Sequence, residues 1–425
     1  MAVHHLRVLA GLVVSSWTFA LPASGLHPLN HPDNSCVLVD LSVTPLVRDA
    51  FLRCPVPAGD DASHINASAI FPWTHPKHCI EAKHGPDNRF CAFTAATSGP
   101  HGLSIVAEPR YAAHMAGFVS DAYQRRIPDP PYKVVELPGK GRGVVATRAI
   151  KRNEAILSDY AVLILDSRVL VALDKEDSDA LLGLATDRLA QPERVYDGAR
   201  SHPEHDIVLD VIATNAFSLD VGNETFYRLF PEIALMNHDC APNARPRFSP
   251  RNFGALVTAT RDIAAGEEIT ITYLAAGLPW YERRQRIRHW GFECTCAKCT
   301  APRDEIRASD DRIRALQQGM EDINTMADER HILNVIRNAH RLLHLADKEG
   351  VAEAGIKVLQ ALKCAFLRRG LLEKAIGYAK QEMDLMVDMG ELDERDQKMV
   401  TEAERQRLRL KYEQARAARA DGNPS

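Results

Sequence analysis

The chain has 425 residues, of which 45% are hydrophobic and 25% are charged. These values are typical of a soluble globular protein, and they exclude a chain that is disordered throughout, a collagen and a polytopic membrane protein. The formal net charge of −4 gives no general attraction to phosphate backbones, so direct nucleic-acid binding is not expected. The length allows two or three domains.

Residues 1–25 have the pattern of a secretory signal peptide: a charged start, an apolar stretch from Val8 to Ala20, and small residues after it. The stretch is shorter than the roughly 20 residues that span a membrane, and no later apolar run predicts a membrane anchor. N-glycosylation triplets at Asn66 and Asn223 fit an exported chain. We predict a secretory-pathway or secreted protein; if residues 1–25 instead fold into the protein, a cytoplasmic or nuclear location is expected.

Residues 26–130 contain an even set of cysteines, Cys36, Cys54, Cys79 and Cys91. An even set suits two disulfides formed in an oxidising compartment. Three pairings are possible, and the local pairs Cys36–Cys54 and Cys79–Cys91 are favoured. Because turn residues are frequent here, we predict a small disulfide-rich domain of loops and short strands that ends at the proline-rich break near residue 130.

The rest of the chain changes from a strand pattern to a helical one near residue 300. Residues 131–300 are predicted to form short strands with a helical insert near 181–189. Residues 301–425 are predicted to be all helical, because apolar residues recur at helical spacing. The overall prediction is an α+β fold. The main strand and helix signals are the runs around the Pro138-Gly139 turn, 155–165, 255–260 and 268–273, and the apolar stripes 332–343 and 358–367, with a turn at Gly370.

The segment CTCAKC places Cys294, Cys296 and Cys299 within six residues. Such spacing suits a metal better than disulfides, because structural zinc is held by four thiolates arranged as a tetrahedron. The fourth ligand must come from elsewhere, and Cys240 is the candidate in this part of the chain. Disulfide pairing and simple thiols are the alternatives. We predict a closed, structural zinc site with no open coordination position.

Four pieces occur in order: GKGRGVVATRAI at 139–150, MNHDCAPN at 236–243, GEEITITY at 266–273 and WGFECTCAKC at 290–299. Together they resemble the SET-domain protein lysine methyltransferases that carry a post-SET zinc cluster. With its helical C-terminal region, the chain is similar to a fungal-type, MYND-SET-like branch. The MYND zinc finger is missing, since no cysteine lies between residues 92 and 239.

The resemblance implies a role for individual residues. The glycine-rich loop and the Asn-His pair would contact S-adenosylmethionine, one tyrosine would stand at the methyl-transfer centre, an aromatic ring would pack against the adenine, and four cysteines would bind zinc. In this sequence these residues are Lys140, Gly141, Arg142 and Gly143; Asn237 and His238; Tyr273; Phe292; and Cys240, Cys294, Cys296 and Cys299.

The implied activity is transfer of a methyl group from S-adenosylmethionine to the side-chain amine of a lysine that a protein substrate presents. A secreted SET-fold binding module without catalytic activity is the alternative. The sequence departs from the family pattern in three places. Asp239 replaces a small hydroxyl residue, the apolar run Ile233-Ala234-Leu235-Met236 replaces an arginine often found upstream of the asparagine, and Leu274-Ala275 stands where a second tyrosine is common. These departures affect the fit of the substrate and leave the degree of methylation open.

Overall fold

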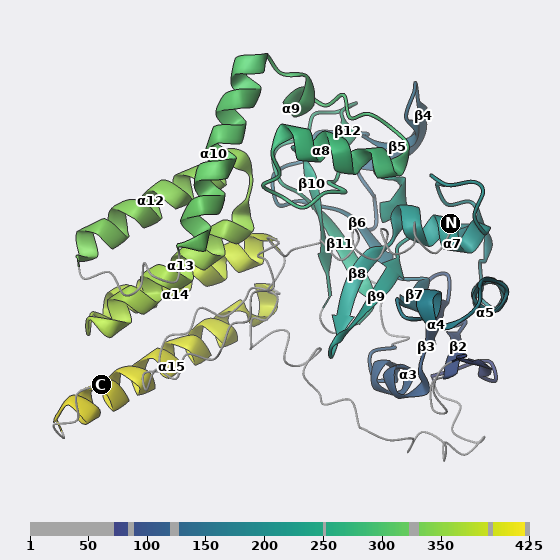
Figure 1. The fold of residues 1–425 in the computed structure, drawn as a ribbon, viewed down its shortest axis with the longest axis horizontal. Helices are drawn as coiled ribbons and strands as arrows, with labels where there is room; N and C mark the ends of the chain where they lie inside the picture. Colours follow the sequence, from purple (N-terminus) through teal and green to yellow (C-terminus); the bar gives the residue numbers. More distant parts are fainter. Residues whose placement is uncertain are drawn as a thin grey trace. The chain divides into compact units, whose positions relative to one another are not determined.

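The computed structural model describes residues 72–83, 89–119, 127–249, 252–322, 331–389 and 394–420 (Figure 1). The predicted signal peptide, the Cys36–Cys54 pair and Asn66 lie outside the described residues. The described chain divides into two compact units, one of residues 72–273 with 287–294 and one of residues 274–286 with 295–420. The first combines strands with short helices and the second is helical, so the predicted α+β class is confirmed.

The largest element of the first unit is a six-stranded sheet with the order β1-β2-β3-β7-β9-β8. Its neighbouring strands are antiparallel except for the parallel pair β3 and β7. Both faces of β2 and β3 are buried because a helix covers each face. The strands are β1 (His78–Glu81), β2 (Arg89–Ala95), β3 (Leu103–Ala107), β7 (Leu163–Asp166), β8 (Phe217–Val221) and β9 (Glu224–Leu229).

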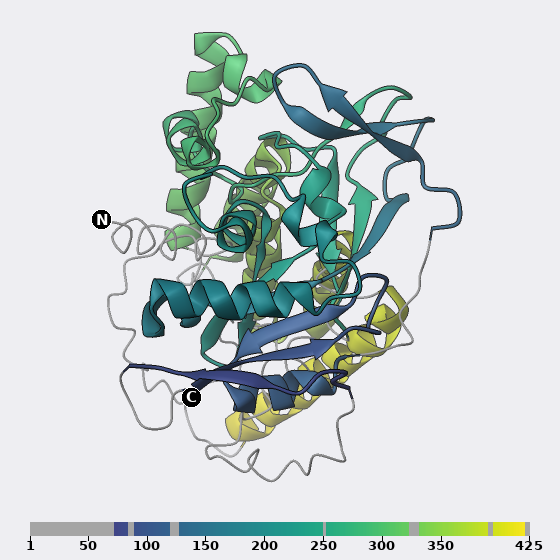
Figure 2. The ribbon, with the colours of Figure 1, turned by 90° about the vertical axis from the view of Figure 1, so that its right-hand side faces the viewer.

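Helices α3 (Pro109–Ala116) and α5 (Lys175–Asp187) pack against β2 and β3. On β3, Ile105 is buried in the same cluster as Met115 of α3, whereas Val106 is buried with α5. Figure 2 shows α5 lengthwise beside these strands. The alternation follows from strand geometry, in which successive side chains point to opposite faces.

The sheet crosses the boundary that the sequence predicts near residue 130. Strands β1 to β3 precede that boundary, and β7 to β9, which follow it, complete the same sheet. Residues 72–119 are therefore part of the first unit and do not form a separate domain. The proline-rich stretch is a connection between strands, because a proline-rich segment interrupts regular structure without requiring that a new core begins. The Cys79–Cys91 disulfide is confirmed, and it joins facing residues of β1 and β2.

Two three-stranded sheets complete the strand structure, with the orders β10-β11-β6 and β12-β5-β4. The run predicted as one strand over 155–165 forms two strands in different sheets. The run predicted over 268–273 is a strand for only two residues. The strands are β4 (Tyr132–Leu137), β5 (Gly141–Ala146), β6 (Ala155–Tyr160), β10 (Ala244–Phe248), β11 (Gly254–Ala259) and β12 (Glu268–Ile269).

Short helices lie between these strands and after the last of them. The predicted helical insert is α5 together with its neighbours, and Asp206 caps α7 by accepting hydrogen bonds from the N–H groups of Val208 and Leu209. The short helices are α4 (Val169–Ala172), α6 (Glu193–Tyr196), α7 (Ile207–Asn215), η3 (Ile233–Leu235), α8 (Trp280–Ile287), η4 (Arg288–Trp290) and α9 (Ala297–Thr300).

The second unit contains the predicted C-terminal helices, which are α10 (Arg303–Glu321), α12 (Ile332–Glu349), α13 (Ala352–Arg368), α14 (Leu372–Met389) and α15 (Glu394–Ala420). Both predicted apolar stripes face their core: Val335 and Ala339 of α12 and Val358 and Leu362 of α13 are fully buried. Gly370 ends α13 with a φ of +70°, as the turn prediction requires. Among the described residues, no helix is long and apolar enough to cross a membrane.

Candidate functional site

The hairpin of β4 and β5 carries the glycine-rich loop. Gly139 and Gly141 have φ values of +73° and +67°, which glycine adopts without a steric cost. Gly143 is needed for a different reason: a Cβ atom there would stand 2.8 Å from the side-chain nitrogen of Asn237 and would overlap Leu137. The absence of a side chain at Gly143 therefore lets the chain around Asn237 lie directly against β5.

The MNHDCAPN loop runs beside the GEEITITY segment, although the two are far apart in sequence. The N–H of Ile271 donates to the carbonyl of Asn237 at 3.0 Å, and the carbonyl of Ile271 accepts from the N–H of Asp239 at 2.9 Å. Asn243 extends the pairing, because its side-chain oxygen accepts the N–H of Thr270 at 2.8 Å. These bonds explain why residues 270–273 do not continue β12: their backbone groups bond to the loop instead.

The contact between residues 236–243 and 266–273 is called the crossing below. Glu268 connects the crossing to the glycine-rich loop. One of its carboxylate oxygens accepts the side-chain N–H of Asn237 at 3.0 Å, and the other accepts Lys140 Nζ at 2.6 Å. Asn237 also donates to the backbone carbonyl of Arg142 at 3.2 Å. The side-chain amide of Asn237 is therefore oriented by two acceptors, and Glu268 joins three of the segments that the sequence singled out.

Tyr273 ends the crossing. Its hydroxyl donates to the carbonyl of Met236 at 2.8 Å, and its backbone N–H donates to Nδ1 of His238 at 3.0 Å. Because Nδ1 accepts a hydrogen bond, a neutral His238 ring carries its proton on Nε2. That atom lies 3.3 Å from the sulfur of Cys240. His238 therefore links the tyrosine to the cysteine cluster through its two ring nitrogens.

The phenol of Tyr273 is held in its neutral form. Burial raises the pKa of Tyr273 well above the ordinary value for tyrosine, and the negative charge of Glu268 raises it further. At neutral pH the group is therefore a hydrogen-bonding hydroxyl and not a base.

Two further aromatic rings, those of Trp290 and Phe292, lie near Tyr273 and His238. The ring centroids of Tyr273 and Trp290 are 5.4 Å apart, and those of His238 and Phe292 are 6.3 Å apart. Trp290 is oriented by its indole N–H, which donates to the carbonyl of Thr214 at 2.8 Å. Phe292 keeps 38% of its surface exposed. An exposed aromatic ring beside a polar crossing offers a face on which a planar group can stack.

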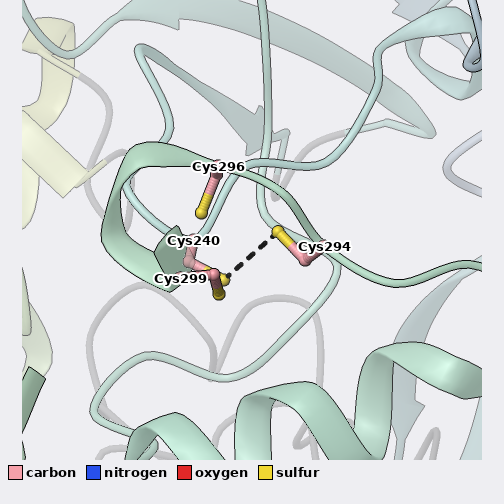
Figure 3. A group of neighbouring side chains, drawn as sticks. All are labelled: Cys240, Cys294, Cys296 and Cys299. Atoms are coloured by element: carbon pink, nitrogen blue, oxygen red, sulfur yellow. Dashed lines mark hydrogen bonds between the residues drawn. The ribbon is translucent and has the colours of Figure 1, made fainter. Parts of the chain in front are cut away.

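The four predicted metal ligands lie together. Cys240, Cys294, Cys296 and Cys299 have their sulfur atoms within 4.8 Å of one another, and the sulfurs of Cys240 and Cys294 are 3.9 Å apart. Figure 3 shows the four side chains pointing toward a common centre. No disulfide joins them, so the alternative of disulfide pairing is wrong for this set.

The cluster fits a zinc ion by its chemistry and its dimensions. A tetrahedron with Zn–S bonds of about 2.3 Å separates its sulfurs by roughly 3.8 Å. The sulfurs of Cys240 and Cys294 have nearly this separation, all four sulfurs lie within 4.8 Å of one another, and Cys294 and Cys299 are buried. A set of four thiols supplies every ligand of a structural zinc site and leaves no position for water.

The model of the SET domain matches residues 141–274, a span that begins in the glycine-rich loop and ends just after Tyr273. Residues 141–274 therefore form a SET domain. The SET match accounts for strand β5, the crossing and the tyrosine as parts of one domain.

Three relatives extend this assignment. The SET-domain chain is 32% identical to the histone-lysine N-methyltransferase set5 of Schizosaccharomyces pombe over 51% of its own length and 66% of the relative. It is 28% identical to the human histone-lysine N-methyltransferase SMYD3 over 45% of its length and 47% of the relative. It is 29% identical to the N-lysine methyltransferase SMYD2-B of Danio rerio over 36% of each chain. The similarity thus covers two thirds or less of each of these relatives.

The structure brings most of the predicted site residues of this SET-domain protein into two groups, one around the crossing and one at the cysteines, with His238 touching both. Lys140 and Arg142 are exposed on the loop, and Arg142 donates to the carbonyl of Asp197. The sequence reasoning missed Glu268 and Trp290. Both lie inside motifs that were singled out, so a search for acidic and aromatic neighbours of the predicted residues within those motifs would have found them.

Proposed function

We propose that this protein is an S-adenosylmethionine-dependent protein-lysine N-methyltransferase. The observation that carries the proposal is the hydroxyl of Tyr273, which donates to the carbonyl of Met236, while the next residue, Asn237, bonds to the glycine-rich loop at Arg142. The names of the relatives, histone-lysine and N-lysine methyltransferases, support the same reaction class. The acceptor is a lysine presented by a protein, and no particular protein is implied by the residues present.

The residues of the loop and the crossing fit S-adenosylmethionine. Gly141 is exposed and has open space where a side chain would stand, so its backbone can be approached closely. Lys140 and Arg142 provide cations for a carboxylate. Phe292 provides an exposed ring for the adenine, and Asn237 an oriented amide. When bound, S-adenosylmethionine supplies a methyl group that a neutral amine can attack.

Tyr273 orients the acceptor amine. Its proton is already donated to the carbonyl of Met236, so the remaining lone pairs of the oxygen can accept a hydrogen bond from the lysine amine or weak C–H···O contacts from a polarised methyl. Because its pKa is raised, the phenol keeps this role at physiological pH. Good alignment of reacting groups can supply about 7–11 kcal/mol of the barrier reduction.

The first test measures methyl transfer. With labelled S-adenosylmethionine and a library of lysine-containing peptides, Tyr273→Phe is expected to reduce turnover by about 10²–10³-fold, the usual cost of losing one well-placed hydrogen-bonding group. Tyr281→Phe is the matched control, since Tyr281 is 66% exposed. Unchanged turnover in Tyr273→Phe contradicts the proposal. Calorimetric binding of the cofactor without any transfer by the wild type indicates a binding module.

We also propose that the four cysteines hold one structural zinc ion. Removal of the metal is expected to abolish cofactor binding indirectly, because His238 bonds to Cys240 and also contacts Tyr273 and Phe292. Calorimetry with S-adenosylmethionine before and after chelation measures this effect. Cofactor affinity that survives complete metal loss contradicts the coupling.

Export of the chain stays a prediction. Tracking a C-terminally tagged chain, with removal of the leader and a glycan at Asn66 as the readouts, tests it. A tagged chain of full length that carries no glycan places the protein in the cytoplasm or nucleus instead.

A further inference from the structure

The turn between the last two cysteines of the cluster is too short to be rigid by itself. Helix α9 (Ala297–Thr300) has one turn, closed by bonds from the N–H groups of Cys299 and Thr300 to the carbonyl of Cys296, at 2.9 and 3.0 Å. One turn of helix pays the nucleation cost without the compensating gain from further turns. Its conformation must therefore be held from outside.

Lys298, which lies between the two cysteines, provides one attachment. Its Nζ is 3.0 Å from a carboxylate oxygen of Glu349, at the end of α12, and 3.3 Å from the backbone carbonyl of the same residue. The side chain of Glu349 is only 2% exposed. It also accepts Ser309 Oγ and Arg312 Nε from α10, each at 2.7 Å. A buried carboxylate with three donors is thus directed at the turn of the cysteine cluster.

Trp280 provides a second attachment. Its indole N–H donates to the carbonyl of Cys299 at 2.9 Å, and its backbone N–H donates to a carboxylate oxygen of Asp310 on α10 at 2.8 Å. The turn is therefore bonded through a side chain at Lys298 and through the backbone at Cys299. Both attachments lead to helices α10 and α12, which contribute no metal ligand.

We propose that Glu349 is a positioning residue for the cysteine cluster. By holding Lys298, it keeps Cys296 and Cys299 in the orientation that converges on the metal, so the C-terminal helices determine how firmly the metal is retained. This inference rests on the proposed zinc site for its metal measurement and on the Lys298–Glu349 contact alone for its second measurement.

The test compares full-length zinc-loaded variants. Zinc content is measured by atomic spectroscopy, and the rate of zinc release to excess chelator is followed by colour change. Glu349→Gln and Lys298→Met are expected to hold one zinc ion per chain but to release it about 10–100-fold faster, the usual range for loss of a group that orients a metal ligand. Because the two residues act through one contact, the double variant should release zinc no faster than either single variant.

The matched control is Glu382→Gln, which alters another buried carboxylate in the same helices. Glu382 accepts Gln360 and Lys363, at 2.9 and 2.6 Å, and neither residue is part of the turn. This control should lower the melting temperature and leave zinc release at the wild-type rate. Wild-type release in Glu349→Gln, or equal acceleration in Glu382→Gln, overturns the proposal.

A second measurement separates this inference from the zinc assignment. In chelated protein, the amide hydrogens of Cys299 and Thr300 should exchange faster in Lys298→Met than in the wild type, because the turn has lost its attachment. If the wild type binds no zinc, the zinc assignment fails, and this exchange measurement still decides the role of the contact. Equal exchange in the two proteins overturns it.

Discussion

The crossing of the MNHDCAPN and GEEITITY segments and the C-terminal helices are built in opposite ways. In the crossing, side chains bond to backbone over long separations: Tyr273 to Met236 over 37 residues and Asn243 to Thr270 over 27. In the helices, the backbone is satisfied locally, and helix-to-helix contacts come from apolar packing and buried charges. A single change in the crossing should therefore alter the site more than the stability. A single change in the helices away from Glu349 should alter the stability more than the site.

The largest expected effect concerns the buried charges of the helices. Lys363 of α13 lies between Glu382 of α14 and Glu404 of α15, at 2.6 and 3.0 Å, and all three side chains are less than 10% exposed. Lys363→Met removes the cation that two buried carboxylates share and leaves Glu404 with Arg407 alone, which should lower the free energy of unfolding by about 3–5 kcal/mol. Denaturation in urea measures the loss.

The control is Lys380→Met on α14, where the side chain is exposed and the change should stay within about 0.5 kcal/mol. At urea concentrations too low to unfold the protein, the two variants should bind S-adenosylmethionine with the same affinity. A change in that affinity in Lys363→Met would remove the contrast between the two regions.

The second-largest expected effect is that two buried carboxyl groups, Asp159 and Glu404, change the stability of the fold in opposite directions with pH. Burial raises the pKa of Asp159 on β6 to about 7, assisted by the charge of Glu232 and opposed by backbone N–H groups that include those of Ile233 and Tyr160. Its folded pKa is above its unfolded value, so its contribution to stability is full below about pH 4 and is lost as the pH rises through 7. Relative to Asp159→Asn, the wild type should lose about 2–4 kcal/mol between pH 4 and pH 8.

Glu404 in the helices should respond in the other direction. Burial alone would raise its pKa, but the hydrogen bond from Arg407 and the charge of Lys363 bring the pKa below the ordinary value. Its contribution is therefore present above about pH 4.5 and is lost on acidification. Urea titrations of Asp159→Asn and Glu404→Gln across this pH range test both signs, and parallel pH profiles would contradict the assignment.

The smallest effect concerns two glycines. Gly143→Ala should weaken S-adenosylmethionine binding by about 10-fold or more, roughly 1.4 kcal/mol, because the new Cβ would displace Asn237. Gly183→Ala, inside α5 with open space around it, should instead stabilise the fold by about 0.5–1 kcal/mol and leave binding unchanged. Calorimetry and thermal unfolding of both variants compare the two. Normal cofactor affinity in Gly143→Ala would show that Asn237 does not depend on this close approach.

Much of the helical region could be predicted because its signals are local. The stripes at Val335 and Ala339 and at Val358 and Leu362 repeat with the period of a helix, and Gly370 marks an end that only glycine favours. The hairpin around Gly139 was predictable for the same reason. The sequence could not show that Ala155–Tyr160 and Leu163–Asp166 belong to different sheets, because one apolar run is compatible with either arrangement.

The sequence alone identified the motif residues and the set of four cysteines, since residue type and spacing reflect the chemistry of a metal. Only the tertiary structure decided which groups meet. It placed Glu268 between Lys140 and Asn237, Glu349 on Lys298, and residues 72–119 in the same unit as the SET match. These contacts join positions far apart in the chain, and no local pattern encodes them, because their stability depends on burial and partners that exist only after folding.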